Sequence, residues 1–105
     1  MNKCKITVLK TTFNKSLAKE YGIDGLARCH IHKVGQTFYV NCSKPEGFCD
    51  EAWHSIYQYV FALLHGGNKV KFYHGNWTKD AGVAICSCND GIRPVIFKVE
   101  KNNTK

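Results

Sequence analysis

The sequence predicts one α+β domain over residues 1–105, in which an antiparallel sheet packs against one long helix. Three observations lead to this fold class. Apolar and polar residues alternate in several short segments, as they do in half-buried strands. One longer segment repeats its apolar residues at spacings of three and four, as in an amphipathic helix. With 44% apolar residues, a chain of this length can also bury a hydrophobic core of its own.

The N-terminal part of the chain predicts a strand followed by a short helix. Cysteine, isoleucine and valine alternate with polar residues over 3–10, so one face of this strand is expected to be buried. Asn14 is the expected N-cap of a helix over residues 15–21. Gly22 follows this segment and is expected to end the helix, because glycine is the residue most often found just past a helix.

A second strand and the main helix are expected in the middle of the chain. After a loop over 22–35, apolar and polar residues alternate again over 36–42. The long helix is expected at about residues 50–65, where the three-and-four spacing of apolar residues is strongest. Asp50 is its expected N-cap, because an aspartate side chain accepts hydrogen bonds from the free N–H groups of the first turn.

The C-terminal part of the chain predicts a hairpin. Its two strands are expected over residues 83–88 and 93–99. Asn-Asp-Gly at residues 89–91 lies between them, and these residue types tolerate the positive φ angles of tight turns. A further short strand is expected over residues 70–74.

The charge of the chain does not favour a nucleic-acid-binding protein. The net charge is +7, but the basic residues are scattered and only Arg28 and Arg93 are arginines. Arginine is the side chain that most often contacts phosphates and bases. A solvated basic surface is therefore the simpler explanation. The sequence names no partner and leaves a homo-oligomer open.

The N-terminal residues lack the apolar region of a signal peptide, and no apolar stretch in the chain is long enough to span a bilayer. We therefore expect a cytoplasmic protein with no membrane partner. In a reducing compartment, its six cysteines are expected to be buried thiols, metal ligands or redox groups, because cytosolic proteins rarely keep disulfides.

Several segments resemble, in their order and spacing, a family of short prokaryotic proteins of unknown function. These segments are Lys-Ile-Thr-Val-Leu-Lys at 5–10, Gly-Gln-Thr-Phe at 35–38, Pro-Glu-Gly-Phe-Cys at 45–49, Ala-Trp at 52–53 and Cys-Asn-Asp-Gly-Ile-Arg-Pro-Val-Ile-Phe-Lys at 88–98. The resemblance brings no established activity. It implies that three cysteines belong to the shared pattern: Cys29, Cys49 and Cys88. It also implies that the remaining candidates are particular to this chain: Cys4, Cys42, Cys86, His30 and His32.

A metal site built from Cys29, Cys49 and Cys88 is the first hypothesis for the function. These cysteines lie on a loop, at a helix start and at a strand end, so folding can bring them together. Zinc and iron favour sets of thiolate ligands, usually four. The sequence offers four candidates for the remaining ligand: Cys86, His30, His32 and Asp90. The usual Cys-x2-Cys spacing is absent.

Two other hypotheses remain open. A thiol or sulfur-handling protein would use a reactive Cys49 or Cys88, and the N-terminal end of a helix would stabilise a thiolate at Cys49. A non-catalytic interaction or accessory protein would bury its cysteines only as small apolar side chains, which is common for free cysteine.

Arg93 and the two tryptophans are further candidates. Arg93 could clamp an anion, but a pair with Asp90 that holds the hairpin is the favoured interpretation. Trp53 is expected in the core, and Trp77 is expected either over a pocket or at the core edge.

His30 and His32 would point the same way in an extended segment, an arrangement that a transition metal can use. Solvent-exposed histidines in a polar loop are the favoured interpretation. The chain contains no P-loop, dinucleotide-binding or hydrolase motif.

Overall fold

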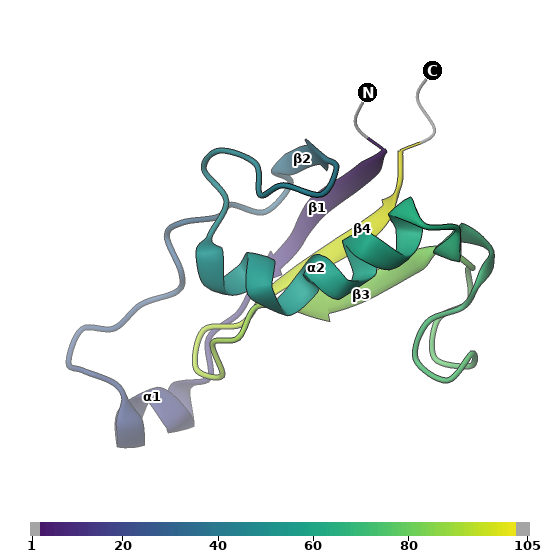
Figure 1. The fold of residues 1–105 in the computed structure, drawn as a ribbon. Helices are drawn as coiled ribbons and strands as arrows, with labels where there is room; N and C mark the ends of the chain where they lie inside the picture. The colour runs from purple at the N-terminus through teal and green to yellow at the C-terminus, as the bar shows by residue number, and fades with distance from the viewer. Residues whose placement is uncertain (1–2, 103–105) are drawn as a thin grey trace.

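Seven elements follow one another along residues 3–102, which are the residues that the computed structural model describes (Figure 1). They are β1 (Cys4–Thr11), α1 (Lys15–Tyr21), β2 (Thr37–Val40), α2 (Asp50–Leu64), the 3-10 turn η1 (Gly67–Lys69), β3 (Val83–Ser87) and β4 (Val95–Lys101). The strands pair antiparallel in the order β2-β1-β4-β3. The predicted fold class is confirmed, including the C-terminal hairpin, the main helix and the short N-terminal helix.

The hydrophobic core lies between α2 and one face of the sheet, and Figure 1 shows α2 crossing that face. The central strands alternate as expected, and each presents three buried apolar side chains to the helix: Cys4, Ile6 and Val8 from β1, and Val95, Phe97 and Val99 from β4. The buried face of α2 consists of Ala52, Ile56, Val60 and Leu63. Burying one valine, leucine or phenylalanine side chain stabilises a fold by about 1.5–3 kcal/mol, so this layer holds the domain together.

The ends of α1 follow the sequence, whereas α2 begins differently from the expectation. The side chain of Asn14 accepts a hydrogen bond from the N–H of Leu17, as predicted for an N-cap. The predicted N-cap Asp50 is wrong, because Cys49 has the extended backbone of the capping position and Asp50 is already helical. The Asp50 carboxylate instead pairs with the Lys44 ammonium at 2.9 Å.

The predicted strand over residues 70–74 is absent from the structure, and this prediction was wrong. Tyr73 and His74 have φ angles of 60° and 65°, a left-handed conformation that cannot continue an extended strand. Residues 70–82 form an irregular connection that lies against β3. The Tyr73 hydroxyl donates a hydrogen bond to the carbonyl of Ile85 at 2.7 Å.

Two left-handed glycines allow a test of how closely this connection packs. Gly47 and Gly82 have φ angles of +82° and +73°, but a Cβ would meet open space at Gly47 and would lie 2.5 Å from the carbonyl oxygen of Asn68 at Gly82. A side chain in the left-handed region costs roughly 1–2 kcal/mol, and a clash in a packed region adds roughly 1–3 kcal/mol. We expect Gly82→Ala to lower the free energy of unfolding in urea clearly more than Gly47→Ala. Equal losses would contradict the close approach at Gly82.

Candidate functional site

The three cysteines of the first hypothesis lie around one end of the fold. There the turn between β3 and β4 contacts the first turn of α2, because the Asn89 side chain donates to the carbonyl of Glu51 at 3.1 Å. The segment before β2 reaches the same end, because the N–H of Cys49 donates to His32 Nε2 at 3.3 Å. Cys29, Cys49 and Cys88 are half-buried and pack against the core. Together with Asp90 and Arg93 they form the candidate site.

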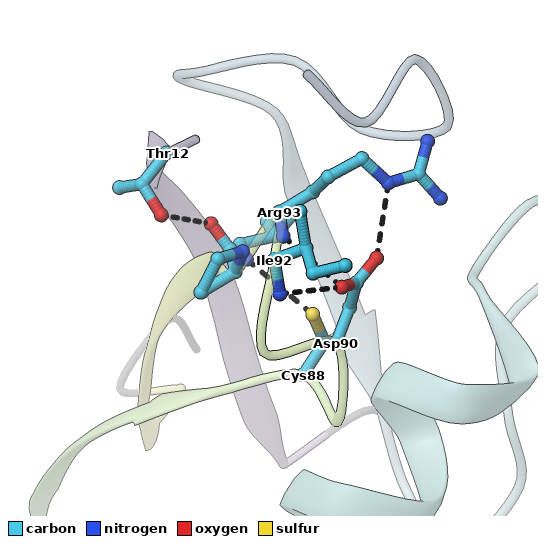
Figure 2. Close-up of polar contacts among 7 residues, drawn as sticks. Thr12, Cys88, Asp90, Ile92 and Arg93 are labelled. Atoms are coloured by element: carbon cyan, nitrogen blue, oxygen red, sulfur yellow. Dashed lines mark hydrogen bonds and ion pairs between the residues drawn. The ribbon is translucent and has the colours of Figure 1, made fainter. Parts of the chain in front are cut away.

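The side chain of Asp90 organises the turn between β3 and β4 (Figure 2). Its Oδ1 accepts hydrogen bonds from the backbone N–H groups of Ile92 and Arg93, at 2.8 and 3.0 Å. Its Oδ2 accepts from Arg93 Nε at 3.0 Å. The predicted pair of Asp90 and Arg93 is therefore confirmed. The turn itself was predicted correctly but for the wrong reason, since none of residues 89–91 has a positive φ.

Asp90 and Arg93 each stabilise the charged form of the other. Partial burial by itself would raise the pKa of Asp90, but the hydrogen bonds from Arg93 and Ile92 outweigh it and lower that pKa. The pKa of Arg93 is raised, first by the hydrogen bond to Asp90 and further by negative charge on Asp90, Cys29 and Cys88. Both thiols therefore lie within electrostatic range of the guanidinium. Figure 2 shows that the contact between the two side chains is made by Nε.

The sulfur of Cys88 accepts a hydrogen bond from the backbone of the β3–β4 hairpin. The N–H of Val95 donates to Cys88 Sγ at 3.4 Å, and the N–H of Cys88 donates to the carbonyl of Val95 at 3.1 Å. The sulfur therefore acts as a hydrogen-bond acceptor at the start of β4.

Cys4 and Cys86 are structural thiols on the inner face of the sheet. Burial raises the pKa of Cys4, and its thiol donates to the carbonyl of Val60 at 3.8 Å. Burial also raises the pKa of Cys86 to about 12, and its thiol donates to the carbonyl of Phe97 at 4.0 Å. Both side chains therefore stay protonated and are poor nucleophiles. Cys42 is exposed at the surface.

His32 is not an exposed loop residue, and this expectation was wrong. Its side chain is 2% exposed and is surrounded by the rings of Phe38, Phe48 and Phe97. A neutral ring with its proton on Nδ1 donates to Gln36 Oε1 at 3.1 Å and accepts from Cys49 at Nε2. Both ring nitrogens are thus engaged within the protein. His30 is exposed, as expected.

The hydrophobic pattern of the sequence did not indicate that His32 is buried. Ile31 is 46% exposed while its polar neighbour is buried, which is the reverse of the usual preference. The Gln36 amide four residues later is the one sequence feature that could have indicated a buried, hydrogen-bonded ring.

The two tryptophans lie in different environments. Trp53 packs against Phe48 and Tyr57, with ring centroids 5.9 and 5.2 Å apart, at the edge of the core. Trp77 lies in the connection before β3 and is 71% exposed. It therefore belongs to the surface rather than to the core edge.

The metal hypothesis gains no support from the geometry. Within residues 3–102, no three His, Cys, Asp or Glu side chains are arranged to hold a metal ion. A zinc or iron site made by Cys29, Cys49 and Cys88, with a fourth ligand from Cys86, His30, His32 or Asp90, stays a prediction from the sequence. The same part of the chain contains no helix with the length and apolar character needed to cross a membrane.

The buried His32 predicts a pH dependence of stability. Burial lowers its pKa in the folded protein, so below about pH 6.5 the unfolded chain takes up a proton that the folded protein does not. Stability is therefore expected to fall as the pH drops from 7 towards 5, by up to about 1.4 kcal/mol per pH unit from this residue. His32→Gln should flatten this slope in urea unfolding, whereas His30→Gln should keep it. Equal slopes in the wild type and His32→Gln would contradict this prediction.

Comparison of the chain with models of protein families finds no match. No curated protein and no solved structure is detectably similar to it either. The resemblance to a family of short prokaryotic proteins therefore stays a prediction from the sequence.

Proposed function

We propose that the protein handles sulfur through Cys88, with Arg93 as the neighbouring cation and Cys29 as a second thiol. One observation carries this proposal: the N–H of Val95 donates to Cys88 Sγ at 3.4 Å, beside the turn in which Asp90 holds the Arg93 side chain. A nearby cation attracts the negative charge of a thiolate, which is the nucleophilic form of cysteine. The N–H of Val95, which donates to Cys88 Sγ, acts in the same direction.

The proposed step is thiol–disulfide exchange with a disulfide or persulfide substrate. The Cys88 thiolate attacks one sulfur of the substrate, a new S–S bond forms, and the substrate S–S bond breaks. The leaving sulfur departs as a thiolate and takes up the proton that Cys88 has lost, so no further oxidant is needed. The Cys29 thiolate then attacks the Cys88 sulfur, a Cys29–Cys88 disulfide forms, and the bound group leaves as a second thiolate. A thiol reductant returns this disulfide to the two thiols by the same exchange.

The other cysteines are less suited to this role. Cys4 and Cys86 have raised pKa values because they are buried. Cys49 is followed directly by the acidic residues Asp50 and Glu51 in the first turn of α2.

Two alternatives from the sequence remain as competing proposals. A metal-binding module would hold zinc or iron through Cys29, Cys49 and Cys88. An interaction or accessory protein would use its cysteines only for packing, and its thiols would then react according to exposure alone.

The test is a competition among the cysteines for a limiting amount of neutral dipyridyl disulfide. The fully reduced chain is treated at neutral pH, and the modified cysteines are located by mass spectrometry of peptides. We expect half-buried Cys88 to react before exposed Cys42. Arg93→Ala should slow the reaction of Cys88 about fivefold. This factor corresponds to about 1 kcal/mol, the upper end of the range for a solvent-screened charge pair. Cys42 serves as the internal control, and its rate should not change.

Four further outcomes complete the design. Arg93→Lys keeps the charge and should retain most of the Cys88 rate. Cys29→Ser should leave the mixed disulfide on Cys88 in place, whereas the wild type should release it. If Cys42 reacts first and Arg93→Ala has no effect, sulfur handling is wrong and packing is favoured. If the purified protein carries near-stoichiometric zinc or iron that Cys88→Ser loses, the metal proposal replaces this one.

A further inference from the structure

A surface hollow lies on the side of the sheet that faces away from α2. Its floor is formed by Val83 and Ile85 of β3, and its rim by Trp77, Lys79, Asp80 and Lys98. Ile85 and Lys98 are cross-strand neighbours, and both alternate with residues of the core. The hollow has a volume of about 350 Å³. This volume falls at the lower end of the range for small-molecule sites, roughly 300–1,000 Å³.

The indole of Trp77 is both exposed and held in place. It stacks on the ring of Tyr73, with centroids 5.7 Å apart and planes 21° apart. Tyr73 is itself anchored to β3 by its hydroxyl, which donates to the carbonyl of Ile85. Exposing a fixed tryptophan leaves a large apolar surface in water. Such a ring is a ready platform on which another planar ring can stack.

A buried hydroxyl beside this indole has no partner. Oγ1 of Thr78, which also lines the hollow, is the one buried side-chain nitrogen or oxygen without a hydrogen bond among residues 3–102. Leaving such a group unsatisfied costs about 1–3 kcal/mol, so each case calls for an explanation. Because this oxygen is buried, a molecule in the hollow satisfies it only when the Thr78 side chain turns outward.

The backbone that places Trp77 is strained. Tyr73 and His74 are the non-glycine residues with positive φ among residues 3–102, and each such conformation costs roughly 1–2 kcal/mol. Strain of this kind collects at ligand clamps and active sites, where the surrounding structure enforces it. Here it turns the chain so that Trp77 stacks on Tyr73.

The residues that line the hollow include two lysines and one carboxylate, and Glu100 adds a second carboxylate beside it. Lys79 and Lys98 face one acidic residue of the rim, Asp80. Lys98 is also 3.2 Å from Glu100, in an ion pair that is partly open to solvent. A solvent-exposed pair of this kind is weak, so the lysine remains able to bind an anion.

We propose that this hollow binds a small planar aromatic molecule that carries a negatively charged group. The ring stacks against Trp77, the anionic group lies near Lys98 and Lys79, and the Thr78 side chain turns so that its hydroxyl reaches a polar atom of the ligand. This site is separate from the cysteines and does not depend on the sulfur chemistry proposed above.

The test follows the two indole N–H signals of the protein by NMR, assigned with Trp77→Ala. Adenosine monophosphate and naphthoate are the probes, because a nucleotide and an aromatic carboxylate are two sources of the same chemistry. Naphthylmethylamine has the ring but a positive charge, so it is the control for charge. Acetate has the negative charge but no ring, so it is the control for the ring. Either probe, or both, should shift the indole N–H signal of Trp77 and the backbone amide signals of Ile85 and Lys98. The indole N–H signal of Trp53 should stay unchanged. The tighter probe identifies the source.

Three variants sharpen the result. Trp77→Ala should weaken binding about tenfold or more, the size of one lost stacking contact, whereas Tyr21→Ala, which removes an equally exposed ring on α1, should not change it. Thr78→Val should raise the melting temperature, because it removes an unsatisfied hydroxyl, and yet weaken binding. The proposal is overturned if neither probe shifts Trp77, if Trp77→Ala binds as tightly as the wild type, or if acetate or the amine binds as well.

Discussion

The burial of one face of α2 against the central strands β1 and β4 is the interaction on which the rest of the structure depends. The side chains of Ile56 and Phe97 are fully buried in this layer. Because the side chains of a strand alternate in direction, fixing the inner face of the sheet also fixes which residues point outward. The outward residues of β3 and β4 then form the floor and rim of the hollow beside Trp77.

The same packing sets the position of the candidate site. Once α2 lies on the sheet, its first turn meets the turn between β3 and β4, and the Asn89 side chain joins the two. The buried ring of His32 joins the segment before β2 to the N-cap of α2. Cysteines far apart in the sequence are thereby gathered at one end, although their arrangement does not form a metal-ligand set.

Two local networks show why side chains matter as much as backbone preferences in this protein. The turn at residues 89–91 has the composition of a positive-φ turn, yet it is held by the Asp90 carboxylate. The segment at 70–74 has the composition of a strand, yet Tyr73 turns the backbone left-handed while its hydroxyl reaches the edge of β3. In both cases the conformation departs from the local propensity and is accompanied by side-chain hydrogen bonds to another part of the chain or to the turn itself.

The sequence by itself determined the fold class, the main helix and the four strands that the sheet contains, although it also predicted a strand over 70–74 that is absent. Period-two and three-and-four patterns report directly on which face of an element is buried. It also identified the pair of Asp90 and Arg93, since these residues are close along the chain. Tertiary structure alone decided that His32 is buried, that Arg93 lies in range of Cys29 and Cys88, and that Trp77 borders a hollow. Each of these depends on contacts between segments distant in sequence, and local patterns carry no information about such distances.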